Sequence, residues 1–172
     1  AFIDQLSQEK NCLAVQKTFE QNINNLESTR IRLENFDREA TLNKNELDLL
    51  KNEYLLAQIR YWLLAERTKE VCGTDIVNIL YFFSDEKECP DCEKQAFILT
   101  YLKKKFKDKL LIFSFESKFE AEPLIPLLKK TYNVSMYPTI VIEGKPRVKF
   151  QDKDTILKEI CSYYKEKTED CS

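Results

Sequence analysis

Two cysteines, Cys89 and Cys92, stand three positions apart in the sequence Glu-Cys-Pro-Asp-Cys of residues 88–92. An apolar run over residues 76–83 precedes them and is typical of a buried strand, and a helical pattern begins at Glu93. Two thiols at this spacing can form a disulfide. The backbone N–H groups and dipole of a helix N-terminus stabilise a thiolate. The pattern therefore predicts thiol chemistry, with Cys89 ionising more readily than an ordinary thiol.

The chain has six cysteines and no histidine among its 172 residues. Without histidine, a Cys-His nucleophile pair, an imidazole acid or base and mixed Cys/His zinc sites are all excluded. An even number of cysteines is typical of disulfide-bonded proteins from oxidising compartments, although the cytosol of hyperthermophiles is an exception. We therefore expect an extracytoplasmic protein that is periplasmic, secreted or membrane-anchored and facing outward. The cytoplasm of a hyperthermophile is the alternative.

The overall charge gives no reason to expect a nucleic-acid partner, because 27 basic and 29 acidic residues sum to −2. No apolar run approaches the roughly 20 residues that a transmembrane helix requires. The sequence starts at Ala1 without an initiator methionine. A signal peptide or a membrane anchor outside this sequence is therefore an open expectation.

Residues 1–73 are predicted to form a helical extension, followed by an α/β domain over residues 74–172. Apolar residues at three-and-four spacing predict a first helix over about 12–37, after a polar lead-in. Thr41 or Asn43 could cap a second helix, which ends before Gly73. Two helices of similar length joined by a short turn should form an antiparallel hairpin. A homodimer through this hairpin is one arrangement that the pattern permits.

The other four cysteines are expected to form two structural disulfides. Cys12 and Cys72 fall at the same, open end of the predicted hairpin, because the midpoint between them is residue 42, inside the turn. Two free buried thiols are the alternative to a bridge between them. A bridge between Cys161 and Cys171 would tie the tail back onto the last predicted helix, and two unrelated thiols are the alternative there.

From residue 76 onward the pattern changes from helical periodicity to alternating strands and helices. The predicted strands are 76–83, 110–115, 139–142 and 147–150, and the predicted helices are 93–106, 122–132 and 154–165. The first strand, helix and strand form a parallel crossover unit, and the last two strands form a hairpin with a turn at Gly144-Lys145. The predicted order is β-α-β-α-β-β-α.

This half of the chain resembles the thioredoxin-like superfamily. The resemblance rests on three features: the Cys89-Pro90-Asp91-Cys92 motif at a strand-to-helix junction, the Met136-Tyr137-Pro138-Thr139 segment before a hairpin strand, and the order of the elements. It covers about residues 74–166 and implies a three-layer α/β/α domain behind the helical hairpin. By resemblance, Tyr137-Pro138 carries a cis-proline that faces the dithiol and lines a substrate groove.

The resemblance also implies roles for the two cysteines. Cys89 would be the exposed attacking thiolate and Cys92 the buried thiol that resolves a mixed disulfide with a protein substrate. Pro90 suits the first helical position, where its missing N–H has no helical partner. The partners implied are protein thiols and disulfides and a redox partner protein. No metal and no cofactor is expected.

The motif departs from the familiar versions of this family in its charge. Pro90 and Asp91 stand between the cysteines, where related enzymes place Gly-Pro, Gly-His or Pro-His. Five acids against two lysines give residues 84–94 a net charge of −3, which opposes thiolate formation. We therefore expect a less oxidising couple than in enzymes with histidine there. Phe82 and Phe83 occupy the place of the family's buried acid, which leaves water or Asp91 to accept the proton of Cys92.

Several alternatives remain open for the pair of cysteines. A disulfide that merely pins the start of a helix is one, and two of the four ligands of a zinc site is another. At the level of function, a thiol–disulfide oxidoreductase competes with a non-enzymatic binding or assembly module that uses the helical hairpin as its interaction surface. The periodicity of the hairpin does not discriminate between these two functions.

Overall fold

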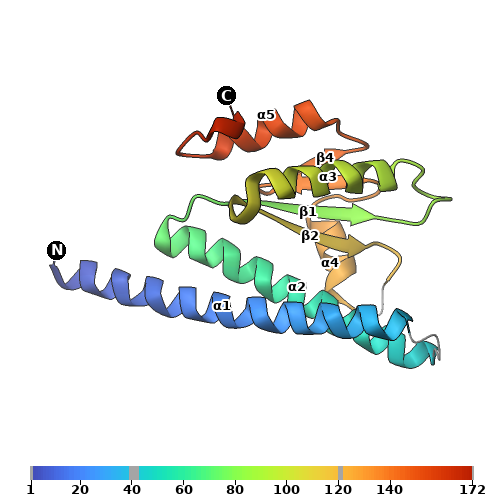
Figure 1. Ribbon diagram of the computed structural model, residues 1–172, viewed down its shortest axis with the longest axis horizontal. Helices are drawn as coiled ribbons and strands as arrows, with labels where there is room; N and C mark the ends of the chain where they lie inside the picture. The colour runs from blue at the N-terminus through green and yellow to red at the C-terminus, as the bar shows by residue number, and fades with distance from the viewer. Residues whose placement is uncertain (1, 39–42, 120–121, 172) are drawn as a thin grey trace. The chain divides into compact units, whose positions relative to one another are not determined.

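The computed structural model describes residues 2–38, 43–119 and 122–171, and for residues 2–10, 37 and 38 it describes the backbone alone. The chain divides into two compact units, Ala1–Thr74 and Asp75–Ser172 (Figure 1). The boundary lies one residue after the position expected from the sequence. None of the described helices has the length and apolar character needed to cross a bilayer.

The first unit is a pair of helices, α1 (Phe2–Arg38) and α2 (Lys44–Cys72). Helix α1 begins at Phe2, so the expected polar lead-in over residues 1–11 was wrong. A polar segment lacks an apolar stripe but is still free to continue a helix, because helix propensity does not require one. Asn43 is the N-cap of α2, its side chain accepting from the Asn45 N–H at 3.1 Å. Thr41, the other expected cap, lies outside the described residues.

The two helices run antiparallel, as three pairs of residues along them establish. The Phe19 and Tyr61 rings stack with centroids 4.7 Å apart, and Arg32 forms an ion pair with Glu53 at 3.0 Å. At the open end, Cys12 and Cys72 form a disulfide with Cα atoms 5.2 Å apart. As the position in α1 advances from Cys12 to Phe19 to Arg32, the partner in α2 moves back from Cys72 to Tyr61 to Glu53. This is the disulfide-closed hairpin expected from the sequence.

Helix α2 ends at a glycine because the chain must enter a left-handed conformation there. Gly73 has φ +66°, and its N–H donates to the carbonyl of Lys69 at 3.0 Å. This closes the last turn of the helix in the usual way for a C-terminal glycine.

The second unit is a mixed α/β domain with the predicted element order. Its elements are β1 (Val77–Phe83), α3 (Cys92–Phe106), the short 3-10 helix η1 (Lys107–Lys109), β2 (Leu110–Glu116), α4 (Leu124–Thr131), β3 (Thr139–Ile142), β4 (Lys145–Val148), α5 (Lys153–Tyr163) and the 3-10 helix η2 (Glu169–Cys171).

The four strands form one sheet in the order β2-β1-β3-β4. β1 pairs parallel with β2 and antiparallel with β3, and β3 pairs antiparallel with β4. The β3–β4 turn is Glu143-Gly144, with φ +48° and +79°, and not the expected Gly144-Lys145. β4 therefore covers 145–148 and not 147–150. Two consecutive positive φ angles are what a two-residue hairpin turn requires, so the turn geometry and not the apolar pattern sets this register.

Helices α3 and α5 cover one face of the sheet, and α4 lies on the other (Figure 1). Alternate residues of β1 point to the two faces, so Ile79 and Tyr81 join a core with Leu102 of α3 and Ile160 of α5. On the opposite face, the ring of Phe82 lies 5.5 Å from that of Phe115 of β2. The predicted fold class, a three-layer α/β/α domain preceded by a helical hairpin, is confirmed.

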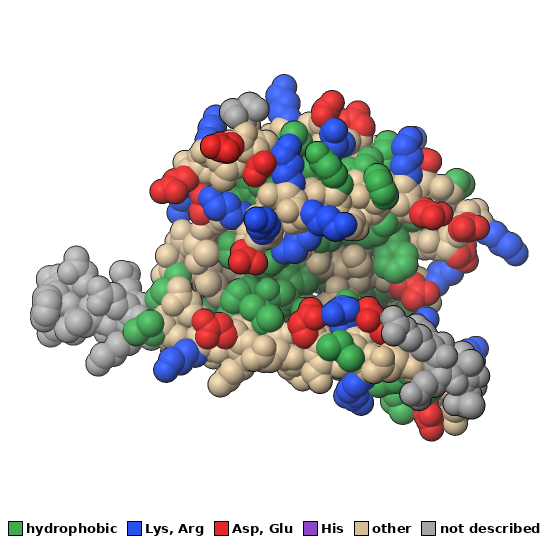
Figure 2. All heavy atoms as spheres, viewed as in Figure 1, with side chains coloured by type: hydrophobic (Ala, Val, Ile, Leu, Met, Phe, Trp, Pro, Cys, Tyr) green, Lys and Arg blue, Asp and Glu red, His purple; other side chains and the backbone are tan. Residues whose placement is uncertain are grey.

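Charged side chains of both signs cover the face drawn in Figure 2, and a group of basic side chains lies together near the middle of the second unit. The net charge of the whole chain is small, at −2. The net charge therefore gives no basis for long-range attraction of a polyanion.

Candidate functional site

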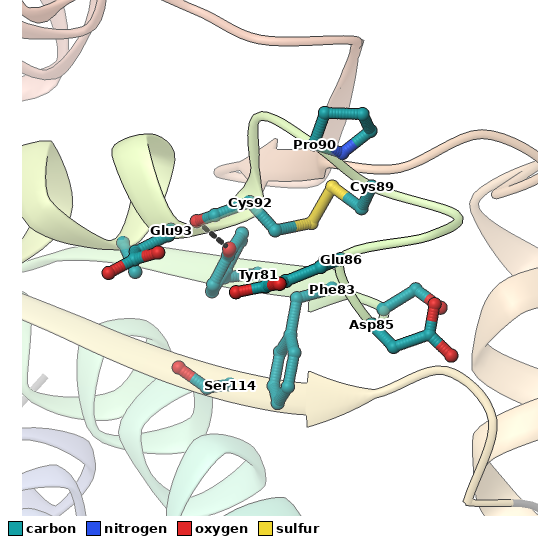
Figure 3. A pocket seen from close by; sticks show the side chains of 11 residues that line it. Tyr81, Phe83, Asp85, Glu86, Cys89, Pro90, Cys92, Glu93 and Ser114 are labelled. Atoms are coloured by element: carbon teal, nitrogen blue, oxygen red, sulfur yellow. Dashed lines mark hydrogen bonds between the residues drawn. A yellow bond between two sulfur atoms is a disulfide. The ribbon is translucent and has the colours of Figure 1, made fainter.

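Cys89 and Cys92 form a disulfide at the junction between β1 and α3, with Cα atoms 5.4 Å apart (Figure 3). The Cys92 N–H donates to the Cys89 carbonyl at 3.3 Å, and Asp91 has φ −94° and ψ −1°. These are the features of a type I turn with Pro90 at its second position, which proline favours. Helix α3 begins only at Cys92. The expectation that Pro90 is the first helical residue was wrong, because the turn takes its place.

Both cysteines are buried in this disulfide state, with Cys89 2% exposed and Cys92 6% exposed. The expectation of an exposed Cys89 therefore does not hold here. The Cys89 N–H donates to the Asp85 carbonyl at 2.7 Å, which closes the loop that follows β1. Pro90 and Asp91 are exposed and form the outer surface of the turn.

The backbone of Cys92 is fixed from below by a tyrosine. Tyr81, on β1, donates its phenol hydrogen to the Cys92 carbonyl at 2.7 Å (Figure 3). Burial raises the pKa of Tyr81 to about 12. The phenol therefore remains a donor throughout the physiological range, and Cys92 is held to the central strand.

A second buried side chain fixes the first turn of α3. Gln95 is 0% exposed, and its amide donates to the Gln151 carbonyl at 3.1 Å while its oxygen accepts from the Gln151 N–H at 2.8 Å. A buried amide costs free energy unless both its donor and its acceptor are paired. This pairing joins the start of α3 to the loop before α5.

A cavity of about 830 Å³ opens beside the disulfide (Figure 3). It lies on the face of the sheet that carries α3, because Tyr81 of β1 and its partner Ser114 of β2 both contribute to it. Its walls come from the two strands, the loop after β1 and the first turn of α3. The lining residues are Tyr81, Phe83, Ser84, Asp85, Glu86, Cys89, Pro90, Cys92, Glu93, Ala96 and Ser114.

The acidic loop before the cysteines is partly neutralised by a lysine that follows β2. Lys118 Nζ lies 2.6 Å from Asp85 Oδ2 and 3.2 Å from Glu88 Oε2. The hydrogen bond from Lys118 holds the pKa of Asp85 below its usual value, with help from the Glu88 N–H. The local charge is therefore less negative than residues 84–94 alone indicate.

The Tyr137–Pro138 peptide bond is cis, as the family resemblance implied. Thr139, the next residue, pairs with Phe82 near the end of β1, so this bond lies at the edge of the sheet from which the cysteine loop departs. The ammonium of Lys129 lies 5.6 Å from the centre of the Tyr137 ring. Tyr137 and Pro138 do not line the cavity described above.

The remaining four cysteines form two further disulfides. Cys161 of α5 is bonded to Cys171, with Cα atoms 5.6 Å apart, and Cys12 is bonded to Cys72 in the hairpin. These are the two pairings expected from the sequence, and no cysteine is free. Within the described part of the chain, no group of three or more His, Cys, Asp or Glu side chains could hold a metal ion.

Sequence reasoning missed three residues that support the disulfide. Tyr81 lies within an apolar run. Its position in the strand shows that its side chain points to the opposite face from Phe82, but it does not reveal the hydrogen bond to Cys92. Gln95 could have been noticed as a polar residue on the buried side of α3. Lys118 lies 33 residues after Asp85, and only the parallel pairing of β1 and β2 brings their ends together.

Comparisons with known proteins give structural likenesses only. No protein-family model and no curated protein sequence matches the chain. Among solved structures, a malarial protein is 19% identical with a TM-score of 0.43, over 51% of this chain and 97% of that one. Chloroplastic thioredoxin z is 17% identical with a TM-score of 0.43, over 58% and 88%. The germline-specific thioredoxin Deadhead from Drosophila melanogaster is 17% identical with a TM-score of 0.41, over 59% and 92%.

Two of these three structures are thioredoxins. At such identities and TM-scores they carry no information about the site. What the site does has to be judged from the residues of this chain.

Proposed function

We propose that the protein is a thiol–disulfide oxidoreductase that exchanges disulfides with protein substrates through Cys89 and Cys92. One observation carries the proposal: the two cysteines are joined in a disulfide in the turn that enters α3, beside an open cavity. A disulfide that spans only three positions stabilises the fold less than one that closes a long loop, so its surroundings call for another explanation.

The exchange transfers two electrons in two steps. In the reducing direction, the Cys89 thiolate attacks one sulfur of a substrate disulfide, and the other substrate sulfur leaves as a thiolate and takes a proton. Cys92 then attacks the Cys89 sulfur, which releases the second substrate thiol and forms the Cys89–Cys92 disulfide. Oxidation of a substrate dithiol is the same sequence in reverse.

The anchoring of the two residues supports this assignment of roles. Cys92 is the first residue of α3, and its carbonyl is held by Tyr81. Cys89 belongs to the turn before the helix, and its N–H is bonded to the Asp85 carbonyl in the loop after β1 rather than to a strand. The turn is therefore the part of the motif that can shift to present its sulfur, while Cys92 stays in place to resolve the mixed disulfide.

We assign modulating roles to Pro90 and Asp91 and a substrate-contact role to Tyr137 and Pro138. Pro90 shapes the turn, and the exposed Asp91 carboxylate disfavours a nearby thiolate. The cis Tyr137–Pro138 bond lies at the same edge of the sheet as the cysteine loop. An extended substrate segment laid along this edge would pass both.

The three disulfides support placement outside the cytoplasm, with a redox partner protein that restores the Cys89–Cys92 couple after each cycle. A membrane anchor and a homodimer through the hairpin belong to the same proposal. Size-exclusion chromatography with light scattering measures the oligomeric state directly.

The experiment that tests the function compares Cys89→Ser with the double variant Cys161→Ser/Cys171→Ser. We expect Cys89→Ser to lose insulin reduction and disulfide formation completely, because no thiolate remains to attack. The control variant removes a disulfide of the same unit and should keep the wild-type rate. Wild-type activity in Cys89→Ser would overturn the proposal.

The burial of both sulfurs favours a second candidate, a binding or assembly module in which the disulfide is structural. A redox titration of the pair discriminates between the two. A potential below about −300 mV is typical of a structural disulfide and favours the binding module, whereas a value in the range of exchange enzymes favours the oxidoreductase.

A further inference from the structure

The cavity beside the disulfide has an aromatic wall. Tyr81 and Phe83 point to the same face of β1, and their rings stack with centroids 5.5 Å apart. Ala96 of α3 and the exposed Pro90 add further apolar surface. A long aliphatic or planar side chain could lie against this wall and exclude water from it.

The same cavity has an acidic rim. Glu86 and Glu93 both line it, and in Figure 3 the Glu86 side chain extends beneath the disulfide toward Tyr81. Neither carboxylate forms an ion pair with another described residue, that is, within residues 2–38, 43–119 and 122–171. Asp85, the third acid of the lining, is already paired with Lys118.

We propose that this cavity is a specificity pocket for an arginine or lysine side chain that neighbours the reacting cysteine of the substrate protein. This inference rests on the proposed exchange activity and names the substrate class that the site prefers. The methylene stem of the cationic side chain lies along Tyr81 and Phe83, and its charged end reaches Glu86 and Glu93. The aromatic faces add a cation–π attraction for the same group.

Other occupants fit the cavity less well. An anionic side chain would meet the unpaired carboxylates of Glu86 and Glu93, which repel it. An apolar side chain would cover the aromatic wall, but it would displace water from the carboxylates without offering them a hydrogen bond in return. Arginine matches the lining better than lysine, because its planar group can stack on a ring and bond a carboxylate at once.

The test measures reduction of three matched disulfide peptides, with dithiothreitol as the reductant that restores the Cys89–Cys92 dithiol in each cycle. The peptides differ only at the residue beside the disulfide-bonded cysteine, which is arginine, leucine or glutamate. We expect kcat/KM of the wild-type protein to be about fivefold higher for the arginine peptide than for the leucine peptide, and lowest for glutamate. The preference should weaken as salt is raised from low to high concentration, because the pocket is open to solvent. In Glu86→Gln/Glu93→Gln, the ratio for arginine over leucine should fall to about one.

The matched control is Glu88→Gln, which removes a neighbouring carboxylate that is bonded to Ser84 and Lys118 and lies outside the cavity lining. It should keep the wild-type ratio. An unchanged ratio in the Glu86/Glu93 variant, with all three rates lowered equally, would overturn the pocket and indicate a role in proton transfer.

Turnover of the small neutral disulfide of hydroxyethanethiol by the wild-type protein separates this inference from the proposed function. Turnover without a preference among the peptides would overturn the pocket alone. No turnover of the small disulfide or of any peptide would overturn the exchange activity, and the pocket with it.

Discussion

The disulfide in the cysteine motif and the disulfide in the hairpin are chemically the same kind of bond, but they close loops of very different length. Cys12 and Cys72 are 60 positions apart, whereas Cys89 and Cys92 are three apart. By loop-closure entropy, the first stabilises the folded chain by about 4 kcal/mol and the second by about 2 kcal/mol. Yet the short disulfide has the buried phenol, the buried amide and the cavity around it. Supporting structure thus surrounds the bond that contributes least to stability, and this agrees with the exchange role that we propose for it.

The largest effect is expected from opening the hairpin. Replacing Cys12 and Cys72 with serine should lower the free energy of unfolding by about 4 kcal/mol, because the unfolded chain regains the freedom of a long loop. Urea denaturation followed by circular dichroism measures the change. The exchange activity of the second unit should remain. A change below about 1 kcal/mol would mean that the loop-closure comparison between the two disulfides fails.

A smaller loss is expected at the C-terminal disulfide. Cys161 and Cys171 are 10 positions apart, so Cys161→Ser/Cys171→Ser should cost about 3 kcal/mol of unfolding free energy. The same denaturation experiment places this variant between the hairpin variant and one that lacks Cys89 and Cys92. A different ranking of the three would show that native-state strain, and not loop length, decides their contributions.

Tyr81→Phe tests the anchor of Cys92 with a change of a single oxygen. The variant leaves the Cys92 carbonyl without its buried donor, which should destabilise the protein by about 1 to 2 kcal/mol. Tyr101→Phe, an exposed change on α3, is a matched control and should be close to neutral. Equal stability of the two variants would mean that the bond from Tyr81 contributes nothing net.

The smallest effect concerns the charge of the loop before the cysteines. Lys118→Met removes the hydrogen bond that lowers the pKa of Asp85, so this pKa should rise toward its usual value near 3.8. Because the folded-state pKa is depressed, the stability that Asp85 contributes is present above its usual pKa and is lost as the pH falls through the folded value. Carboxyl-carbon NMR titration measures the shift. An unchanged pKa in the variant would assign the depression to the backbone N–H groups alone.

The order of strands and helices in the second unit could be predicted because β1, β2 and β3 are largely buried and stand in the sequence as apolar runs, separated by segments with helical periodicity. The disulfide pairs followed from the same order, since a hairpin brings Cys12 to Cys72 whatever its detailed packing. These predictions depend on hydrophobic periodicity and on the lengths of individual segments, both of which can be read from short stretches of the sequence.

The details of the site could not be predicted in the same way. Whether Pro90 lies in a turn or in the first turn of the helix depends on where α3 begins, and both conformations accept proline. The pairing of Lys118 with Asp85 depends on the register of two parallel strands, and many lysines could have stood near that loop. The start of α1 at Phe2 was missed because amphipathic patterns report burial, and a helix can continue without it.

Gln95 has a mechanical consequence for the second unit. Its amide presents one donor and one acceptor to the backbone of Gln151, as a neighbouring strand would, although neither residue belongs to the sheet. The first turn of α3 is thus hydrogen-bonded at two points, to β1 through Tyr81 and to the loop before α5 through Gln95. Because both sets of hydrogen bonds hold the first turn of α3 in place, we expect that opening or closing the disulfide changes only the conformation of the turn that precedes the helix.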